Sequence, residues 1–271
     1  MYIAFLDESD HTTKNKFTVC GMTVFPVDKL EQLSSEISAL RDSAKFGPCD
    51  ALKFASSSRP DSCSEKTHLE LKRSCIDLAN HVGAVFFAYA YFNGDDEANN
   101  PDRNRIFGFN TLLHRYDAFL SKKESVGIAL CDRLEIEKNK KNKKKVVLKY
   151  RDGFEYLREK FQLGNDFPDG KRKNLSRILA FGQTADGLSH ASSVNDILTG
   201  GMRYVANGDK ESARKDIQED IERVMCRGDD GKFKDTGFLL RPLSRKNLPE
   251  DTLAEYDALR AFLNNASAKS A

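Results

Sequence analysis

The chain has 271 residues, of which 39% are apolar and 31% charged, a composition typical of folded, highly charged globular proteins. Its 43 Lys and Arg residues nearly balance its 41 Asp and Glu residues, so the net charge of +2 excludes attraction of nucleic acid by the field of the whole molecule. The six cysteines include no C-x-x-C pair, which argues against the usual structural zinc sites and favours buried, reduced thiols in a cytoplasmic protein.

The sequence predicts no signal peptide and no membrane-spanning segment. The opening run Met1–Leu6 is short and meets Asp7 and Glu8 at once, with no basic residues before it. The longest apolar stretch, residues 82–92, is far shorter than the ~20 residues that a membrane-spanning helix needs.

Strands are expected where short apolar runs end in polar or turn residues, and helices where apolar residues recur every three or four positions. In chain order, we expect strands at residues 2–6 and 17–25, helices at 29–44 and 65–81, a strand at 84–92, a helix at 106–120, a strand at 126–131, a helix at 146–161, a strand at 177–181, and helices at 192–205, 210–225 and 252–263. The first two strands are close enough to form a hairpin.

This order of elements predicts an α/β fold. Five strands interleaved with helices and opened by a hairpin indicate a mixed five-stranded sheet with helices on both faces. We expect residues 1–207 to form this domain and residues 208–271 to form a C-terminal helical extension. The extension would cover the sheet, or contact a protein partner or a second copy in a homo-oligomer.

Two of the expected strands end in the same way. Residues 3–7 read Ile-Ala-Phe-Leu-Asp, and residues 128–132 read Ile-Ala-Leu-Cys-Asp. Ligands collect at the carboxyl ends of strands in such sheets, so Asp7 and Asp132 would lie side by side if the two strands are parallel neighbours. A divalent cation would relieve the repulsion between these carboxylates, and oxygen ligands suit Mg²⁺ or Mn²⁺. The alternative is that each Asp caps a turn.

Two further acids are weaker candidates. Asp196 lies in the first turns of the helix expected at residues 192–205, where Ser192 is a possible N-cap and Asp196 either a ligand or a partner of the helix dipole. Glu8 follows Asp7 on a strand, so its side chain points to the opposite face unless the chain bends there.

The sequence Asp7-Glu8-Ser9 after the first strand, Asp132 after a middle strand, and Ser192 with Asp196 on a late helix together resemble the bacterial family catalogued as domain of unknown function 3800. The resemblance covers approximately residues 1–207.

The chain departs from the family at two positions. Asp10 stands where the family usually has Gly, and Ser193 stands where it often has Gln. These departures concern the geometry around the acids rather than their placement.

The resemblance implies a ribonuclease H-like domain with a two-metal phosphodiesterase site. By this resemblance Asp7 would bridge the two metals, while Asp132 and Asp196 would each complete the coordination of one. Lys53 corresponds loosely to a Lys-bearing segment of the family. It would contact the scissile phosphate, unless it is a solvated surface lysine.

Two basic clusters make nucleic acid, either DNA or RNA, a plausible partner. Residues 138–145 hold six lysines and follow Asp132 closely, and Lys171-Arg172-Lys173 with Arg177 precede the fifth strand. Either cluster is otherwise a solvated loop. His11 and His190 lie near the proposed acids in sequence, with a bystander role as the simpler interpretation.

The hypothesis from the sequence is a divalent-metal-dependent nuclease that hydrolyses nucleic-acid phosphodiester bonds by a two-metal mechanism. A toxin or defence effector is one biological role for such an enzyme. The alternatives are a non-catalytic nucleic-acid- or protein-binding module on the same fold, and a hydrolase of a nucleotide or another small phosphate.

Overall fold

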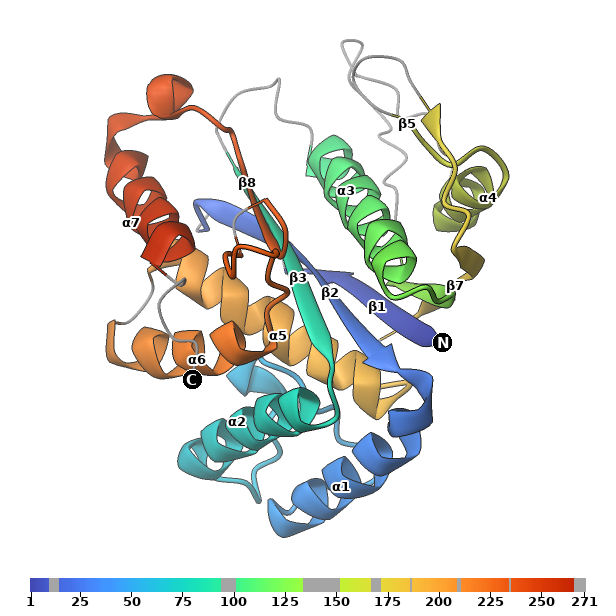
Figure 1. Cartoon of the computed structure of the whole chain (residues 1–271). Helices are drawn as coiled ribbons and strands as arrows, with labels where there is room; N and C mark the ends of the chain where they lie inside the picture. Colours follow the sequence, from blue (N-terminus) through green and yellow to red (C-terminus); the bar gives the residue numbers. More distant parts are fainter. Residues whose placement is uncertain are drawn as a thin grey trace, which may run out of the picture.

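The computed structural model describes a central sheet with helices on both faces (Figure 1). The described residues are 1–9, 15–93, 101–133, 152–166, 172–185, 187–208, 211–233 and 235–265. Every statement below concerns these residues.

The main sheet has six strands in the order β7-β4-β1-β2-β3-β8. Their bounds are β1 (Tyr2–Glu8), β2 (Phe17–Pro26), β3 (Val85–Phe92), β4 (Gly127–Asp132), β7 (Ile178–Thr184) and β8 (Phe238–Arg241). The strand β2 is antiparallel to both of its neighbours, and every other pair is parallel. The predicted α/β fold with a mixed sheet is confirmed.

The condition for Asp7 and Asp132 to lie side by side, parallel pairing of the two similar strands, is met. In the parallel pair β1–β4, Ile3 lies opposite Ile128 and Ala4 lies opposite Ala129. The matching sequence runs are therefore in register. Because both strands run the same way, they end at the same edge of the sheet.

The expectation of five strands and a purely helical C-terminal extension is wrong at residues 238–241. These four residues form β8, which pairs in parallel with β3 at the edge of the main sheet. So short a run, between two turn-rich segments, carries no periodicity that distinguishes a strand from a loop. A second, two-stranded sheet of β5 (Asn165–Asp166) and β6 (Arg172–Lys173) lies in a stretch that we expected to be a loop.

All seven expected helices are present. They are α1 (Leu30–Ser43), α2 (Glu65–His81), α3 (Pro101–Lys122), α4 (Gly153–Leu163), α5 (His190–Asn207), α6 (Glu211–Val224) and α7 (Leu253–Asn265), with short 3-10 turns η1 (Val27–Lys29), η2 (Ser56–Ser58), η3 (Arg245–Asn247) and η4 (Glu250–Thr252). The expected helix at 146–161 corresponds to α4, and the first six residues of that expected range, 146–151, lie outside the described residues. Across the described ranges, none of the helices combines the length and the apolar character needed to cross a membrane.

The side chains of β1 alternate between two hydrophobic cores. Phe5 packs on the side of α1, α2, α5, α6 and α7, whereas Ala4 and Leu6 pack on the side of α3 and α4 (Figure 1). This alternation is the ordinary two-residue period of a strand. It predicts the face on which each acid at the end of the strand emerges.

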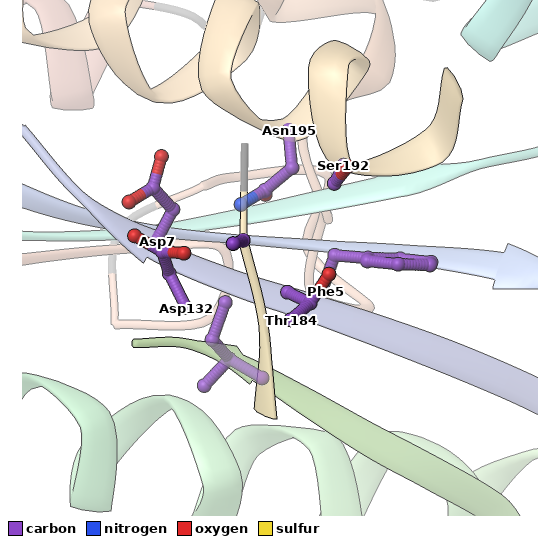
Figure 2. Close-up of a pocket in the computed structure, with 8 residues that line it drawn as sticks. Phe5, Asp7, Asp132, Thr184, Ser192 and Asn195 are labelled. Carbon is purple, nitrogen blue, oxygen red and sulfur yellow. The ribbon is translucent and has the colours of Figure 1, made fainter. Parts of the chain in front are cut away.

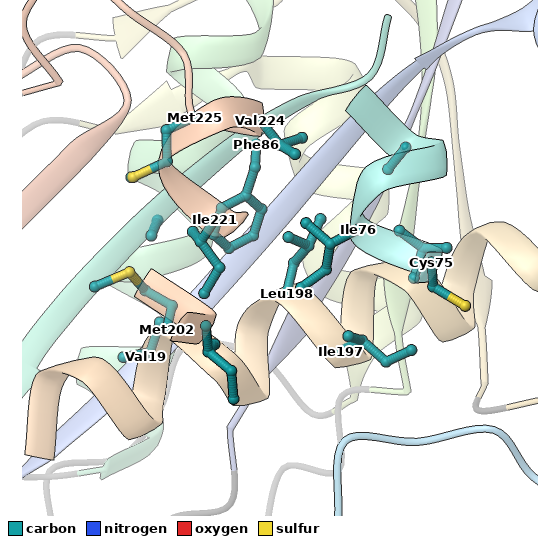
Figure 3. Close-up of a cluster of buried hydrophobic side chains, with 14 of the residues drawn as sticks. Val19, Cys75, Ile76, Phe86, Ile197, Leu198, Met202, Ile221, Val224 and Met225 are labelled. Carbon is teal, nitrogen blue, oxygen red and sulfur yellow. The ribbon is translucent and has the colours of Figure 1, made fainter. Parts of the chain in front are cut away.

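The helix α5 lies at the centre of the larger core. Its residues Ile197, Leu198 and Met202 meet apolar side chains of α2, α6 and the sheet (Figure 3). Its approach to β2 depends on Gly21, because a Cβ at that position would lie 1.9 Å from Thr199 Oγ1. The close packing of α5 on the sheet fixes the height of its first turns above the strand ends.

Four of the six cysteines are buried, and no disulfide joins any of the six in the described structure. The expectation of buried cysteines is confirmed for Cys20, Cys63, Cys75 and Cys131, whereas Cys49 is exposed and Cys226 is partly exposed.

Candidate functional site

A small cavity lies where β1, β4 and β7 end beneath the first turns of α5 (Figure 2). It is lined by Phe5, Leu6, Asp7, Asp132, Thr184, Ala185, Ser192 and Asn195. Its enclosed volume is about 10 Å³, which is about what one water molecule needs, and the cavity is partly open to solvent. The cavity therefore has room for one ion or one water, and any larger group would approach from its open side.

Asp7 and Asp132 come together in this cavity because of the strand pairing. The last pair of the β1–β4 ladder is Leu6 with Cys131, so the two aspartates are the next residues on adjacent parallel strands. Both follow a residue that faces α3, so both turn toward α5. The prediction that the two lie together at one edge is confirmed. Their role as metal ligands stays a prediction.

The first turns of α5 close the cavity from above. Its N-cap is Ser189, whose Oγ accepts a hydrogen bond from the Ser192 N–H at 3.0 Å. In return, Ser192 Oγ accepts from the Ser189 N–H at 3.2 Å and donates to the Ser189 carbonyl at 2.8 Å. Ser192 is therefore the third residue of the helix rather than its N-cap, and its hydroxyl serves this capping box.

Asn195 is a lining residue that sequence reasoning missed. Its side chain is almost fully buried, at 1% exposure, and its Oδ1 accepts a hydrogen bond from the buried Thr23 Oγ1 at 2.8 Å. Figure 2 shows the amide nitrogen on the side of the cavity where Asp7 and Asp132 lie. The sequence predicts the neighbouring acid, Asp196, at this position instead.

Asp196 does not line the cavity. Its Oδ2 accepts a hydrogen bond from the Phe54 N–H at 2.6 Å, and the Phe54 carbonyl accepts one from Lys72 Nζ at 3.1 Å. Successive residues of a helix are about 100° apart around its axis, so Asn195 and Asp196 emerge on different sides. Asp196 thus helps to hold the segment between α1 and α2 against α5. Its proposed role as third ligand stays a prediction.

Glu8 emerges on the α3 side of the sheet, as strand alternation predicts. Its Oε1 accepts a hydrogen bond from Arg105 Nη1 at 2.6 Å, which forms a partly buried ion pair. The next residue, Ser9, accepts a hydrogen bond from the Val19 N–H at 2.9 Å and so extends the pairing of β1 with β2. Of the motif Asp7-Glu8-Ser9, only Asp7 lines the cavity.

Lys53 also lies outside the cavity lining. Its backbone carbonyl accepts a hydrogen bond from His68 Nε2 at 3.2 Å, in the same segment that Asp196 contacts. Burial, together with the charge of Lys72, lowers the pKa of His68 to about 4. His68 is therefore a neutral structural residue at neutral pH.

The predicted basic clusters and histidines are only partly described. Residues 138–145, Lys171 and His11 lie outside the described residues. Arg172 forms an ion pair with Asp166 at 2.6 Å within the two-stranded sheet, and Lys173 and Arg177 are exposed. His190 Nε2 lies 3.1 Å from Ser38 Oγ and does not line the cavity.

The donor set of the cavity is made of oxygen atoms rather than sulfur. Burial raises the pKa of the Cys131 thiol well above its ordinary value, and the charge of Asp132 raises it further, so this cysteine stays neutral and is a poor ligand. Within the described residues, no group of three or more His, Cys, Asp or Glu side chains is arranged to hold a metal ion. The carboxylates present fit one hard cation, since Mg²⁺ usually binds one or two carboxylates and keeps several waters.

Comparison of the chain with protein-family models and with curated proteins gives no match. The function is therefore argued from the cavity and its residues.

Proposed function

We propose that the cavity binds a divalent cation, Mg²⁺ or Mn²⁺, between Asp7 and Asp132, and that the protein is a nuclease that hydrolyses phosphodiester bonds there. The observation that carries this proposal is the convergence of two carboxylates from adjacent parallel strands on one cavity. A cation bound between two carboxylates is attracted by both negative charges.

The size of the cavity favours a substrate that offers only its phosphate group. An enclosed volume of about 10 Å³ is far too small for a whole nucleotide, but the cavity is partly open to solvent. A phosphodiester in a longer chain would reach the carboxylates from outside. In the hydrolysis, a water oxygen bonds to phosphorus, one phosphorus–oxygen ester bond breaks, and the leaving oxygen takes up a proton. A bound Mg²⁺ or Mn²⁺ would supply water activation and charge neutralisation.

The order of the strands supports a ribonuclease H-like fold as part of the proposal. A hairpin of β1 and β2 continues into β3, and β4 and β7 then add to the other side of β1 in parallel. This arrangement makes the first and fourth strands parallel neighbours, as that fold requires. A shared fold does not by itself establish an activity, so the proposal rests on the carboxylates.

The decisive experiment measures cleavage of labelled single- and double-stranded DNA and RNA with Mg²⁺ or Mn²⁺. We expect the wild-type protein to cleave at least one of these, and both Asp7→Asn and Asp132→Asn to lower the rate about a thousandfold, since the metal contributes several kcal/mol. Glu8→Gln is the matched control, because it removes an adjacent carboxylate that faces α3. Activity that survives in both aspartate variants would overturn the proposal.

A non-catalytic binding module is the second candidate, and one observation favours it. Within the described residues the cavity gathers two carboxylates rather than the three of the predicted two-metal site. Thermal melting separates the candidates. A cation site predicts a Mn²⁺-dependent rise in melting temperature that Asp7→Asn removes, with about 2.7 kcal/mol of stabilisation at a hundredfold excess over the dissociation constant. A module without a cation site predicts no rise.

A further inference from the structure

Asn195 occupies the cavity in a way that its packing does not explain. The oxygen end of its amide is held from behind, because Oδ1 accepts a hydrogen bond from Thr23 Oγ1 on β2. Thr23 is itself fully buried, so this hydrogen bond fixes the plane and the direction of the amide.

The nitrogen end of the same amide faces the cavity. Nδ2 donates no hydrogen bond to any residue in the described part of the chain, although the residue is only 1% exposed. It lies on the side of Asp7 and Asp132 in Figure 2. The amide nitrogen is therefore available to donate to a water or a ligand in the cavity.

With a cation between Asp7 and Asp132, a negatively charged phosphate oxygen would be a suitable acceptor for Nδ2, because hydrogen bonds to charged groups are stronger than neutral ones. The one hydroxyl that α5 brings to the cavity, that of Ser192, already donates to the Ser189 carbonyl. Asn195 is therefore the side chain of α5 that has a donor directed at the cavity.

We infer that Asn195 is a substrate-binding residue, whose Nδ2 donates a hydrogen bond to a non-bridging phosphate oxygen of the substrate. The inference rests on the proposed function, because the phosphate would be shared between this amide and the cation held by Asp7 and Asp132. In this arrangement the strand ends bind the cation, and α5 binds the anionic phosphate.

The test uses melting temperatures with Mg²⁺ alone and with Mg²⁺ plus inorganic phosphate. For the wild-type protein we expect a rise with Mg²⁺ and a further rise with phosphate. Asn195→Asp keeps an oxygen for Thr23 but replaces the donor with a negative oxygen. It should retain the Mg²⁺ rise and weaken the apparent affinity for phosphate by about tenfold to a hundredfold, as expected for a hydrogen bond to a charged group.

Asn195→Ala gives the same test if the aspartate variant does not fold. It should also retain the Mg²⁺ rise and lose the phosphate increment. A full phosphate increment in either variant would overturn the inference, as would loss of the Mg²⁺ rise in Asn195→Ala, which would assign the amide to the cation. A wild-type protein that responds to Mg²⁺ but not to phosphate overturns this inference alone. A wild-type protein that responds to neither overturns the proposed function with it.

Discussion

Two neighbouring acids of β1, Asp7 and Glu8, emerge on opposite faces of the sheet and have different surroundings. Glu8 emerges toward α3 and is joined to Arg105 in a partly buried ion pair. Asp7, one residue earlier, emerges toward α5 and shares a cavity with a second carboxylate, Asp132. On the α3 face the acid is paired with a cation of the protein, whereas on the α5 face two carboxylates line one cavity. Carboxylates that meet in a cavity at the carboxyl ends of strands are typical of a binding site.

The largest expected effect comes from the glycines that let a helix approach β2 on each face. On the α5 face, Gly21→Ala would place a Cβ 1.9 Å from Thr199 Oγ1, and on the α3 face, Gly108→Ala would place one 2.7 Å from Cys20 Sγ. We expect Gly21→Ala to destabilise the protein by about 3 kcal/mol, because packed cores tolerate added volume poorly.

Gly108→Ala is the control for the opposite face. Its clash is milder, and alanine in a helix recovers about 1 kcal/mol relative to glycine. Urea unfolding of both variants measures the difference. Because Gly21→Ala displaces α5, it should also weaken the phosphate-dependent rise in melting temperature. An equal loss of stability in the two variants would contradict the closer packing of α5.

The next largest loss of stability is expected when the ion pair between Glu8 and Arg105 on the α3 face is removed. Glu8→Gln removes the charged partner of Arg105 and should lower the free energy of unfolding by about 2 kcal/mol, since partly buried hydrogen bonds to charged groups contribute about 1.5 to 3 kcal/mol. The rise in melting temperature with Mn²⁺ should be unchanged. If Glu8→Gln abolishes that rise, Glu8 acts as a ligand and the contrast between the two faces is lost.

The dependence of stability on pH probes the α5 face away from the cavity. The pKa of His68 is about 4 in the folded protein and about 6.5 in an unfolded chain. Between these values the unfolded state binds the extra proton, so stability is complete above about pH 6.5 and is lost as the pH falls toward 4.

Allowing for solvent screening, this loss should amount to about 1 to 2 kcal/mol. Unfolding free energies measured from pH 7 to pH 4 test it. His68→Gln keeps a donor for the Lys53 carbonyl and cannot be protonated, so it should flatten this part of the profile. An unchanged profile would assign the acid sensitivity to other groups.

The smallest change in stability is expected for a substitution of Asp196. The same variant tests whether Asp196 is a metal ligand like Asp7. Asp196→Asn keeps an oxygen for the Phe54 N–H but removes the charge, which should cost about 1 kcal/mol. The Mn²⁺-dependent rise should persist, in contrast to Asp7→Asn. Loss of the rise in calorimetric melting of Asp196→Asn would restore Asp196 as a third ligand.

The sequence predicts most of the architecture because the strands of the sheet centre are long and apolar. The repeated Ile-Ala run of β1 and β4 points to two strands that end in the same way, and in the structure the two runs are in register. The edge strand β8 escapes prediction because Phe238–Arg241 is too short for periodicity and depends on the partner edge of β3.

The site is harder to predict than the sheet. Asp7 and Asp132 can be predicted as site residues because the strands that they end can be predicted. On α5, sequence alone does not give the rotation of the helix, and one step of about 100° decides whether Asn195 or Asp196 faces the cavity. That rotation is set by the packing of Thr199 over Gly21, a contact between residues far apart in the chain.

The place of β8 sets the order in which the chain can complete its fold. Its partner β3 is translated much earlier, and until residues 238–241 arrive the outer edge of β3 offers unpaired backbone groups. An open edge of this kind can pair with a strand of another molecule, which is a common route to aggregation during folding. A segment that is translated late therefore protects one that is translated early, and a nascent chain cut before Phe238 would be exposed to that hazard for its whole lifetime.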